Sequence, residues 1–394
     1  MNENYHYGQV IKEYRQKQGM SQATLAENWP NHSVNIRYVQ FVENGEKKIT
    51  DQNTLRDLSE LLNIPLWRFG LSEYNPFNPS KLPGRGEHMY QETLDVVDHL
   101  IQQTWYMRRV APLPETEKTA KRLLELFTYF LKYLPPPSIL EPRFLRLHAQ
   151  VYRLIAIMQI ERKQYGEAIK SFFDMFSVAK QLGEPTTLAL ALMGIGVELE
   201  RAGDQQEAVN RLEEARDISF NTSKRVAALV NAYLARAYAS NKDALHFQRA
   251  IDTAQTLSEY LKPTEIDTDY VFHRKSGILA EKSYGYLEIN EPKKTLDLQK
   301  EITRQIDLDN NAWLRAWMPL DWARAYFMLN EIEKSVEETR KFFYRASKLQ
   351  SPHTINRAYE HLITLEEAGY ADVKAVQDFR DELNQIHKKP KHQR

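Results

Sequence analysis

The residues best suited to specific recognition lie near the start of the chain, at Asn35, Arg37, Tyr38 and Gln40. They belong to a short amphipathic run whose apolar residues recur at helical spacing, so the polar residues share the exposed side of a helix. Guanidinium, amide and phenol groups donate or accept hydrogen bonds. The chemistry predicted here is non-covalent contact with a polar surface.

Motifs of catalysis or metal binding are not found in the sequence. The pair Gly194-x-Gly196 lacks the preceding strand and the third glycine of a nucleotide-binding loop. The run Asp307-x-Asp309 begins like a calcium loop but lacks the later Gly and the closing Glu. The 11 histidines form no HExxH pair, and a chain without cysteine has no thiolate metal site. We therefore expect no enzyme activity, no cofactor and no metal.

Composition and charge place the protein among ordinary globular chains. Of 394 residues, 42% are apolar and 27% are charged. No run approaches ~18 consecutive apolar residues and the N-terminus lacks a signal-peptide core, so we expect a cytoplasmic protein without a membrane segment. Residues 1–70 hold eight basic and eight acidic side chains. A face that binds nucleic acid must therefore come from the arrangement of basic residues, and the only plainly basic run is His387–Arg394.

The spacing of apolar residues predicts an all-α protein. Apolar residues recur every three or four positions, glycine is scarce at 14, and no alternating strand pattern of useful length occurs. Prolines, glycines and Asn-Pro steps gather in SEYNPFNPSKLPGRG, which predicts a linker over residues 72–86. The predicted domains are residues 1–71 and 87–394. A second break, YLPPPSILEP, separates two helices within the larger part.

The larger part repeats a pattern of one helix with small residues, a polar turn and a second amphipathic helix. The residues that open the second helices are 40, 39, 48, 40 and 40 positions apart, which predicts helical hairpins stacked into a solenoid. Two helices of a hairpin approach closely only where side chains are short. The aligned opening residues are Ala168, Ala208, Phe247, Thr295, Ser335 and Ala375, and the small residues of the first helices are Ala156, Gly196, Ala235, Ser283 and Ala323.

Five short helices are predicted in the first 70 residues. The first is Tyr7–Gln18, the second is Gln22–Asn28 with Ser21 as its N-cap, and the third is Asn35–Glu43. Four leucines between residues 55 and 62 supply the fourth, and a short fifth follows. The second and third helices, joined by a turn, form a helix-turn-helix arrangement. The predicted inward-facing residues are Val10, Ile11, Tyr14, Leu25, Ala26, Ile36, Val39, Val42, Leu55, Leu58, Leu61 and Leu62.

Three stretches, MSQATLA, VQFVENG and DQNTLRDLSELLNIPLWRF, resemble the lambda-repressor-type (Xre family) DNA-binding domain. The resemblance implies that the second helix contacts a phosphate, that the exposed side of the third helix reads bases, and that Arg15 pairs with Glu43 as a structural tie. An apolar residue among the base readers can meet a thymine methyl group. The implied contacts are Gln22 on the second helix, Asn35, Ile36, Arg37, Tyr38, Gln40 and Phe41 on the third, and Asn44 and Gly45 after it; Lys47 and Lys48 are either phosphate contacts or exposed turn residues.

The repeated hairpins resemble degenerate tetratricopeptide repeats, with a period longer than the usual ~34 residues. A five-helix helix-turn-helix domain followed by a right-handed α-solenoid of such hairpins resembles the peptide-pheromone-responsive transcription regulators of bacteria. That resemblance implies a quorum-sensing homodimer that binds double-stranded DNA and, in its repeat domain, a short peptide or other ligand. An alternative is an interaction adaptor, in which the repeats bind a protein and the N-terminal unit docks a protein rather than DNA.

Candidate ligand-binding residues follow from the register of the repeats. In a stacked array the first helix of each hairpin lines the concave side, and the residue after the small packing position points into the groove. Arginines at matching points on separate hairpins could clamp a carboxylate or backbone carbonyls. Alternatively, these arginines pair with Glu or Asp on neighbouring helices. The residues assigned to the groove are Arg153, Asn231, Arg236, Tyr284 and Arg324.

Overall fold

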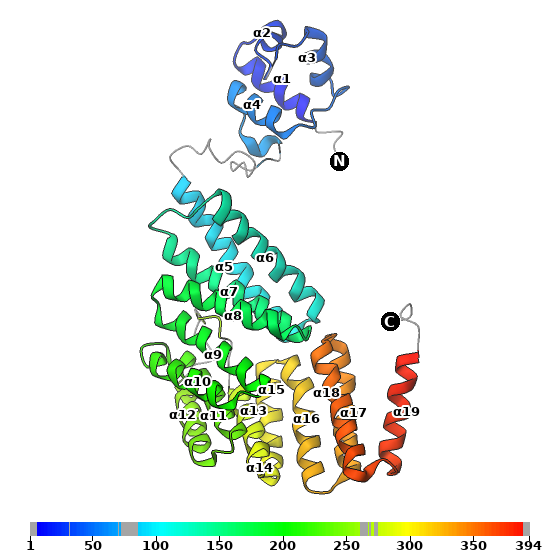
Figure 1. The fold of residues 1–394 in the computed structure, drawn as a ribbon. Helices are drawn as coiled ribbons and strands as arrows, with labels where there is room; N and C mark the ends of the chain where they lie inside the picture. The colour runs from blue at the N-terminus through cyan, green and yellow to red at the C-terminus, as the bar shows by residue number, and fades with distance from the viewer. Residues whose placement is uncertain are drawn as a thin grey trace. The chain divides into compact units, whose positions relative to one another are not determined.

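The computed structural model describes residues 6–30, 32–69, 71, 86–260, 267, 269–271 and 275–388. Over these residues the secondary structure is helical and contains no strand, which confirms the predicted all-α class. The chain divides into two compact units, Met1–Met89 and Tyr90–Arg394 (Figure 1). The predicted linker lies outside the described residues except for Gly86, as does most of the predicted basic tail. No described helix is both long and apolar enough to cross a membrane.

The N-terminal unit packs short helices around one apolar core. The starts of the second and third helices are fixed locally: the Ser21 Oγ accepts a hydrogen bond from the Thr24 backbone N–H at 3.0 Å, and the Asn35 Oδ1 accepts one from the Tyr38 backbone N–H at 2.8 Å. Most predicted inward residues are buried, while Tyr14 and Leu61 are partly buried against the core. The elements are α1 (Tyr7–Lys17), α2 (Gln22–Glu27), α3 (Ile36–Glu43), α4 (Gln52–Leu62) and the 3-10 helix η1 (Leu66–Phe69).

One inward assignment in this unit is wrong. Ile36 is 46% exposed rather than buried. The reason is that Asn35 has an extended backbone and serves as the N-cap of α3, so the helix begins one residue later than predicted. With Ile36 as its first residue, α3 turns Val39, Val42 and the Glu43 side chain inward.

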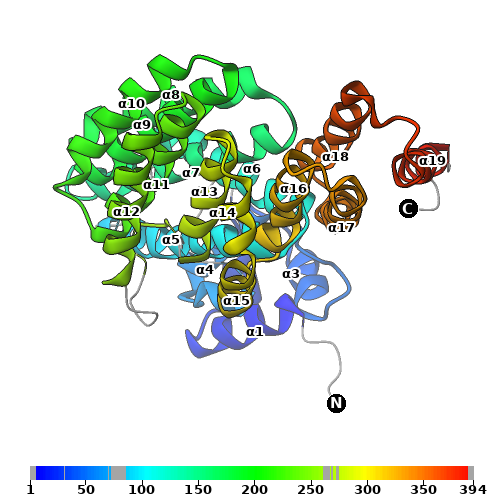
Figure 2. The same ribbon diagram turned by 90° about the horizontal axis from the view of Figure 1, so that it is seen from below.

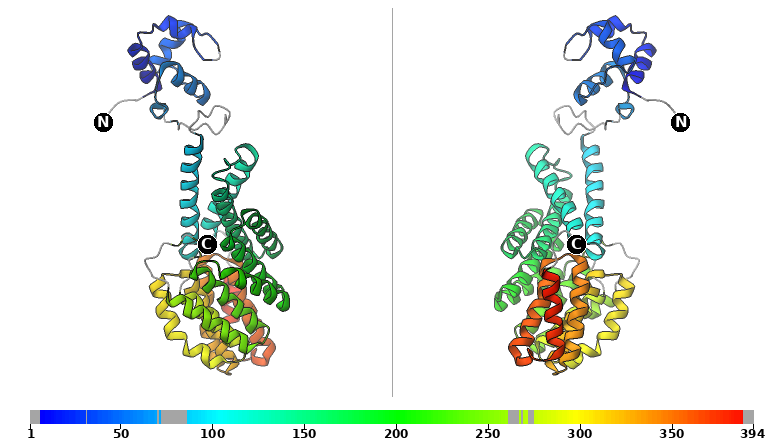
Figure 3. Two further views of the ribbon diagram at one scale, coloured as in Figure 1. Left: turned by 90° about the vertical axis from the view of Figure 1, so that its left-hand side faces the viewer. Right: turned by 90° about the vertical axis from the view of Figure 1, so that its right-hand side faces the viewer.

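The second unit is a stack of helical hairpins, preceded by two long helices (Figures 1 and 3). Its hairpins pair α7 with α8, α9 with α10, α11 with α12, α13 with α14–α15, α16 with α17, and α18 with α19. The bounds are α5 (Gly86–Val110), α6 (Leu113–Tyr133), α7 (Glu141–Glu161), α8 (Tyr165–Leu182), α9 (Pro185–Ala202), α10 (Gln205–Ser219), α11 (Lys224–Ser240), α12 (Ala244–Glu259), α13 (Lys275–Glu288), α14 (Pro292–Asp297), α15 (Gln299–Asp309), α16 (Ala312–Met328), α17 (Ile332–Leu349), α18 (Pro352–Leu365) and α19 (Lys374–Lys388).

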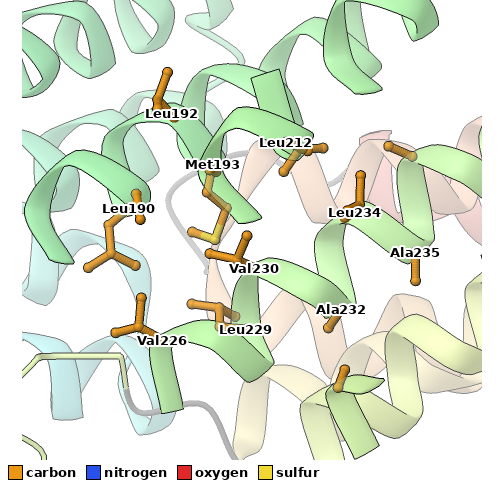
Figure 4. Packing of buried hydrophobic residues seen from close by; sticks show 14 of the residues in the cluster. Leu190, Leu192, Met193, Leu212, Val226, Leu229, Val230, Ala232, Leu234 and Ala235 are labelled. Atoms are coloured by element: carbon orange, nitrogen blue, oxygen red, sulfur yellow. The ribbon is translucent and has the colours of Figure 1, made fainter. Parts of the chain in front are cut away.

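In three hairpins the small residue of the first helix lies against the opening residue of the second: Gly196 against Ala208, Ser283 against Thr295, and Ala323 against Ser335. A Cβ on Gly196 would stand 2.7 Å from the Leu212 Cγ, so α9 and α10 approach more closely than any larger residue allows. In two later hairpins the aligned residue is polar, and the Ser335 Oγ donates to the Ala323 carbonyl at 2.8 Å. Between hairpins, apolar side chains of α9, α10 and α11 interdigitate (Figure 4). The sixth hairpin differs because Ala375 is only partly buried.

The array returns to its first hairpin. Near the C-terminal end of α7, Glu161 accepts hydrogen bonds from Ser351, the N-cap of α18, at 2.5 Å and from Thr354 at 3.3 Å. The Tyr165 hydroxyl lies 2.9 Å from the His353 Nδ1 of α18. Figure 2 shows the repeat unit from below, with α8–α12 on one side and α16–α18 on the other. Because hairpins far apart in sequence meet here, the concave side is partly enclosed.

Candidate nucleic-acid interface and ligand pocket

The outer side of α3 presents a compact polar and apolar face. Arg37 and Gln40 are exposed one turn apart, with Ile36 and Phe41 beside them, each 46% exposed. Side chains three or four positions apart share one side of a helix, so Arg37 neighbours Gln40 and Phe41, Ile36 neighbours Gln40, and the four form one continuous surface. Such a surface offers one guanidinium, one amide and two apolar groups, which can hydrogen-bond and pack against a polar partner with methyl groups.

A buried network holds this face in place. Arg15 binds Glu43 through two hydrogen bonds, Nε to Oε1 at 2.6 Å and Nη2 to Oε2 at 3.0 Å, and both side chains are nearly fully buried. Gln22 donates to the Glu43 Oε2 at 2.7 Å and accepts from the Gln40 Nε2 at 3.3 Å. The structure thus connects α1, α2 and α3 through charge-assisted bonds, which fixes the angle of α3.

Other predicted contact residues lie around the ends of α3. Asn35 uses its side-chain oxygen as the helix cap. Tyr38 is partly buried, with its ring edge-on to Trp29 at 5.4 Å between centroids and the Lys47 ammonium 4.5 Å from its centre. Asn44 is exposed and donates to the Glu46 carboxylate at 3.4 Å, and Lys48 is exposed. Sequence reasoning missed Trp29, which is 5% exposed and anchors the loop before α3.

In the repeat unit, the interior holds two adjoining pockets, of about 390 and 510 Å³. The first helix of every hairpin contributes to the first pocket, together with α5 and Val271. Trp105, Trp313 and Trp317 form aromatic parts of its wall. Its charged residues are the arginines Arg108, Arg109, Arg153, Arg201, Arg236 and Arg357 and the glutamates Glu161, Glu198 and Glu281.

Four of the five predicted groove residues line these pockets. Arg236 donates to the Glu200 Oε2 at 2.8 Å and lies 4.3 Å from the centre of the Tyr284 ring. Arg324 donates to the Glu288 Oε1 at 2.8 Å. Both arginines therefore form the ion pairs with neighbouring helices that the sequence left open as an alternative.

Arg153 is almost fully buried, and its hydrogen bonds go to uncharged acceptors. Its Nη1 lies 3.1 Å from the Tyr270 carbonyl oxygen, and its guanidinium stacks 4.6 Å from the Trp105 ring centre. Asn231, the fifth predicted residue, lines neither pocket; its side chain donates to the Ala227 carbonyl at 2.8 Å within α11. Local bonding to its own helix takes this amide out of the groove.

Burial and the surrounding arginines shift the pKa of several groups in and beside the pockets. Burial lowers the pKa of Arg153 to about 10 and raises the pKa of Glu281 to about 7 and that of Asp321 to about 6. Burial, followed by the positive charges of Arg201 and its neighbours, lowers the pKa of His353 to about 3. His353 is therefore neutral at physiological pH.

Sequence reasoning missed Arg108, Arg201, Arg357 and the tryptophans of the wall. No repeated motif marks them, because α5 precedes the repeats and the others depend on which hairpins meet across the interior. Among the described residues, no group of three or more His, Asp or Glu side chains could hold a metal ion. The polar groups of the pocket are suited to binding through hydrogen bonds and charge.

Comparison with known proteins identifies the N-terminal unit. Residues 11–66 match the model of the helix-turn-helix family HTH_3, which confirms the predicted domain of the Xre type. No curated protein matches the chain.

Three solved structures are similar to the chain. They are the apo form of RapI (12% identity, 76% of this chain and 91% of that chain covered, TM-score 0.48), PlcR of Bacillus thuringiensis in complex with the peptide PapR7 and DNA (12%, 88% and 96%, 0.39), and the apo form of the competence regulator ComR from Streptococcus vestibularis (15%, 91% and 97%, 0.35). At such identities and TM-scores, these similarities say nothing by themselves about what this chain binds.

Proposed function

Because residues 11–66 form a helix-turn-helix domain, we propose that this protein is a DNA-binding transcriptional regulator whose repeat unit senses a peptide or other ligand. The observation that carries the proposal is the outer face of α3, where Arg37 and Gln40 stand together on a helix fixed by the Arg15–Glu43 tie. A rigid recognition helix with exposed guanidinium and amide groups suits the major groove.

The proposed contacts follow from the exposure of each residue. Arg37 and Gln40 read base edges, since Arg pairs with guanine and Gln with adenine through two hydrogen bonds. Ile36 and Phe41 meet thymine methyl groups. Phosphate contacts set the register of the domain on the DNA. In this proposal they come from the exposed lysines after α3, Lys47 and Lys48, and from polar residues at the helix ends, Gln22, Asn35 and Asn44.

The repeat unit supplies the response in this proposal. A pocket lined by every hairpin links ligand binding to the arrangement of the whole array. We also propose that the protein is bacterial, cytoplasmic and a homodimer. The homodimer is proposed because two helix-turn-helix domains together recognise a palindromic site with half-sites about 34–36 Å apart. Sedimentation of the full chain at micromolar concentration measures this, and a monomer that stays monomeric on the selected DNA would contradict it.

Selection of bound sequences from random duplex DNA tests the function. A recovered consensus, with affinity that falls steeply as salt rises, supports DNA reading, because each phosphate contact contributes about −0.9 to the log–log slope. Uniform weak binding without a consensus would favour the alternative, an adaptor whose N-terminal unit docks a protein. Residues 1–70 hold equal numbers of acidic and basic side chains, so net charge alone does not predict DNA binding and the salt dependence has to be measured.

A further inference from the structure

We propose that the first pocket of the repeat unit takes an anionic ligand, a short acidic peptide with an aromatic or apolar side chain. This rests on the proposed function, in which the repeat unit senses a ligand, and it specifies the chemistry of that ligand. Three independent features of the pocket carry it: an excess of guanidinium groups, buried donors without acceptors, and a segment of the chain itself that is already bound at the pocket's edge.

Six arginines and three glutamates line the pocket, and two of the arginines also pair with glutamates outside the lining, Arg236 with Glu200 and Arg357 with Glu360. The glutamates are already engaged: Glu161 accepts from Arg108 at 2.7 Å, Glu198 from Arg201 at 3.3 Å, and Glu281 lies 3.7 Å from Arg236. Arg153 makes no ion pair within the described part of the chain and is 5% exposed. Asp267 and Asp269 act on it only from beyond hydrogen-bond distance, and a buried cation whose hydrogen-bond partners are uncharged is stabilised most by an anion.

Several buried donors in the pocket lack an acceptor. The Trp313 side chain is buried, and its indole Nε1, a hydrogen-bond donor, has no hydrogen-bond partner in the described structure. The Nε atoms of Arg108 and Arg357 are also buried and have no hydrogen-bond partner among the described residues. Trp313 and Arg108 stack, with the guanidinium 3.7 Å from the ring centre, so both donors are held rigidly. These groups donate only, so a ligand that satisfies them must bring oxygen acceptors.

The described residues between α12 and α13 show what this wall already binds. Arg153 donates to the Tyr270 carbonyl, the Tyr270 side chain is buried in the cluster of α5–α7, and Val271 lines the pocket. Just before them, Asp267 pairs with Arg225 at 3.4 Å and Asp269 accepts from Ser223 at 2.5 Å. An arginine of the pocket wall thus already holds a backbone carbonyl of the chain, and the same segment is bound through its carboxylates and its aromatic ring outside the pocket lining; these are the groups of an acidic peptide.

Three pools of random heptapeptides test the inference on the full-length protein. One pool carries Asp or Glu at two positions, the second carries Asn or Gln there, and the third carries Lys or Arg. Thermal shift identifies a binding pool, and titration calorimetry of resolved peptides gives the dissociation constants. We expect an acidic peptide to bind at least tenfold more tightly than its amide isostere, about 1.4 kcal/mol.

Variants locate the binding. Arg153→Gln and Trp313→Phe should each weaken binding of the acidic peptide at least tenfold. Arg211→Gln, at an exposed position of α10, should leave the affinity unchanged. Trp313→Phe keeps an apolar ring, so it serves even if Arg153→Gln fails to fold. Equal or tighter binding of the neutral or basic pool, binding by no pool, or binding unaffected by both pocket variants overturns the inference. A neutral peptide that still changes DNA affinity would leave the proposed function standing while removing the charge preference.

Discussion

Replacing Glu281 by Gln should stabilise the repeat unit at pH 8 and change its stability much less at pH 5. Glu281 lies on α13 at the wall of the first pocket, with a side chain only 15% exposed and Arg236 at 3.7 Å as its ion-pair partner. Burial raises the pKa of Glu281 from 4.5 to about 7, because the nearby arginine does not compensate for the lost hydration. Gln has the shape of the protonated acid and no charge.

The magnitude follows from the two pKa values. The unfolded chain releases the proton near pH 4.5, whereas the folded chain keeps it until about pH 7. Between these values the folded state binds more protons, so the free energy of unfolding falls as pH rises, and the full loss is present above pH 7. A difference of about 2.5 pKa units corresponds to about 3 kcal/mol. Below pH 4.5 the residue costs nothing, since it is protonated in both states.

Urea unfolding at pH 5 and pH 8, followed by tryptophan fluorescence, measures the effect. Glu281→Gln should raise the free energy of unfolding by up to ~3 kcal/mol at pH 8. Glu214→Gln, at a half-exposed position on α10, is the control and should change stability by less than ~0.5 kcal/mol at both pH values. A gain of equal size at pH 5 and pH 8, or a loss at pH 8, would refute the buried-carboxyl explanation.

Three further predictions concern the recognition helix and the packing of the repeats. Arg37→Ala and Gln40→Ala should each reduce discrimination between the selected DNA site and its point mutants by ~1–3 kcal/mol, and wild-type binding curves would exclude base reading. Arg236→Met should destabilise the repeat unit by ~3–5 kcal/mol, because it leaves the buried Glu200 carboxylate without a cation, whereas Arg324→Met should cost less, since Glu288 keeps the Lys242 ammonium at 3.2 Å; an unchanged melting temperature of the Arg236 variant would contradict this. Gly196→Ala should lower stability in urea by ~1–3 kcal/mol, since its Cβ meets a leucine of α10 at 2.7 Å.

The N-terminal unit could be predicted because its signals act over a few residues. Ser21 caps α2 and Asn35 caps α3, and both side chains accept the bond that the helix start leaves open. The exposure of Ile36 was missed because the same Asn35 cap shifts the start of α3 by one residue. Trp29 could not be predicted because it lies in an irregular loop, where no spacing shows that its ring packs on Tyr38.

The repeat period could also be predicted, whereas the closure of the array could not. The aligned opening residues occupy the fourth position of α8, α10, α12, α14 and α17, and the 48-residue step coincides with the longer connection between α12 and α13. The contact between Ser351 and Glu161 joins residues 190 positions apart. Such a contact depends on the summed curvature of all hairpins, which no local pattern encodes.

Partners of the groove residues follow a regularity that appears only in the folded array. Arg236 and Arg324 each pair with a glutamate 36 positions earlier, on the first helix of the preceding hairpin. The sequence placed these arginines on the concave side, but the choice between a free donor and an ion pair depends on the neighbouring helix. Asn231 was assigned to the same side and instead bonds to its own helix.

Stability alone does not account for the charged interior of the repeat unit. Buried ion pairs such as Arg236–Glu200 contribute little net free energy, and well-packed apolar residues in their place are often neutral or stabilising by ~1–4 kcal/mol. Arg153 has even less compensation, since its pKa is lowered by burial and its hydrogen bonds go to neutral oxygens. An anionic ligand changes this balance, because the groups whose burial costs free energy become its strongest contacts. A ligand that binds only the folded repeat unit raises its free energy of unfolding by RT ln(1 + [L]/Kd). Because the charged contacts lower Kd, this gain should exceed what the buried contact area alone suggests.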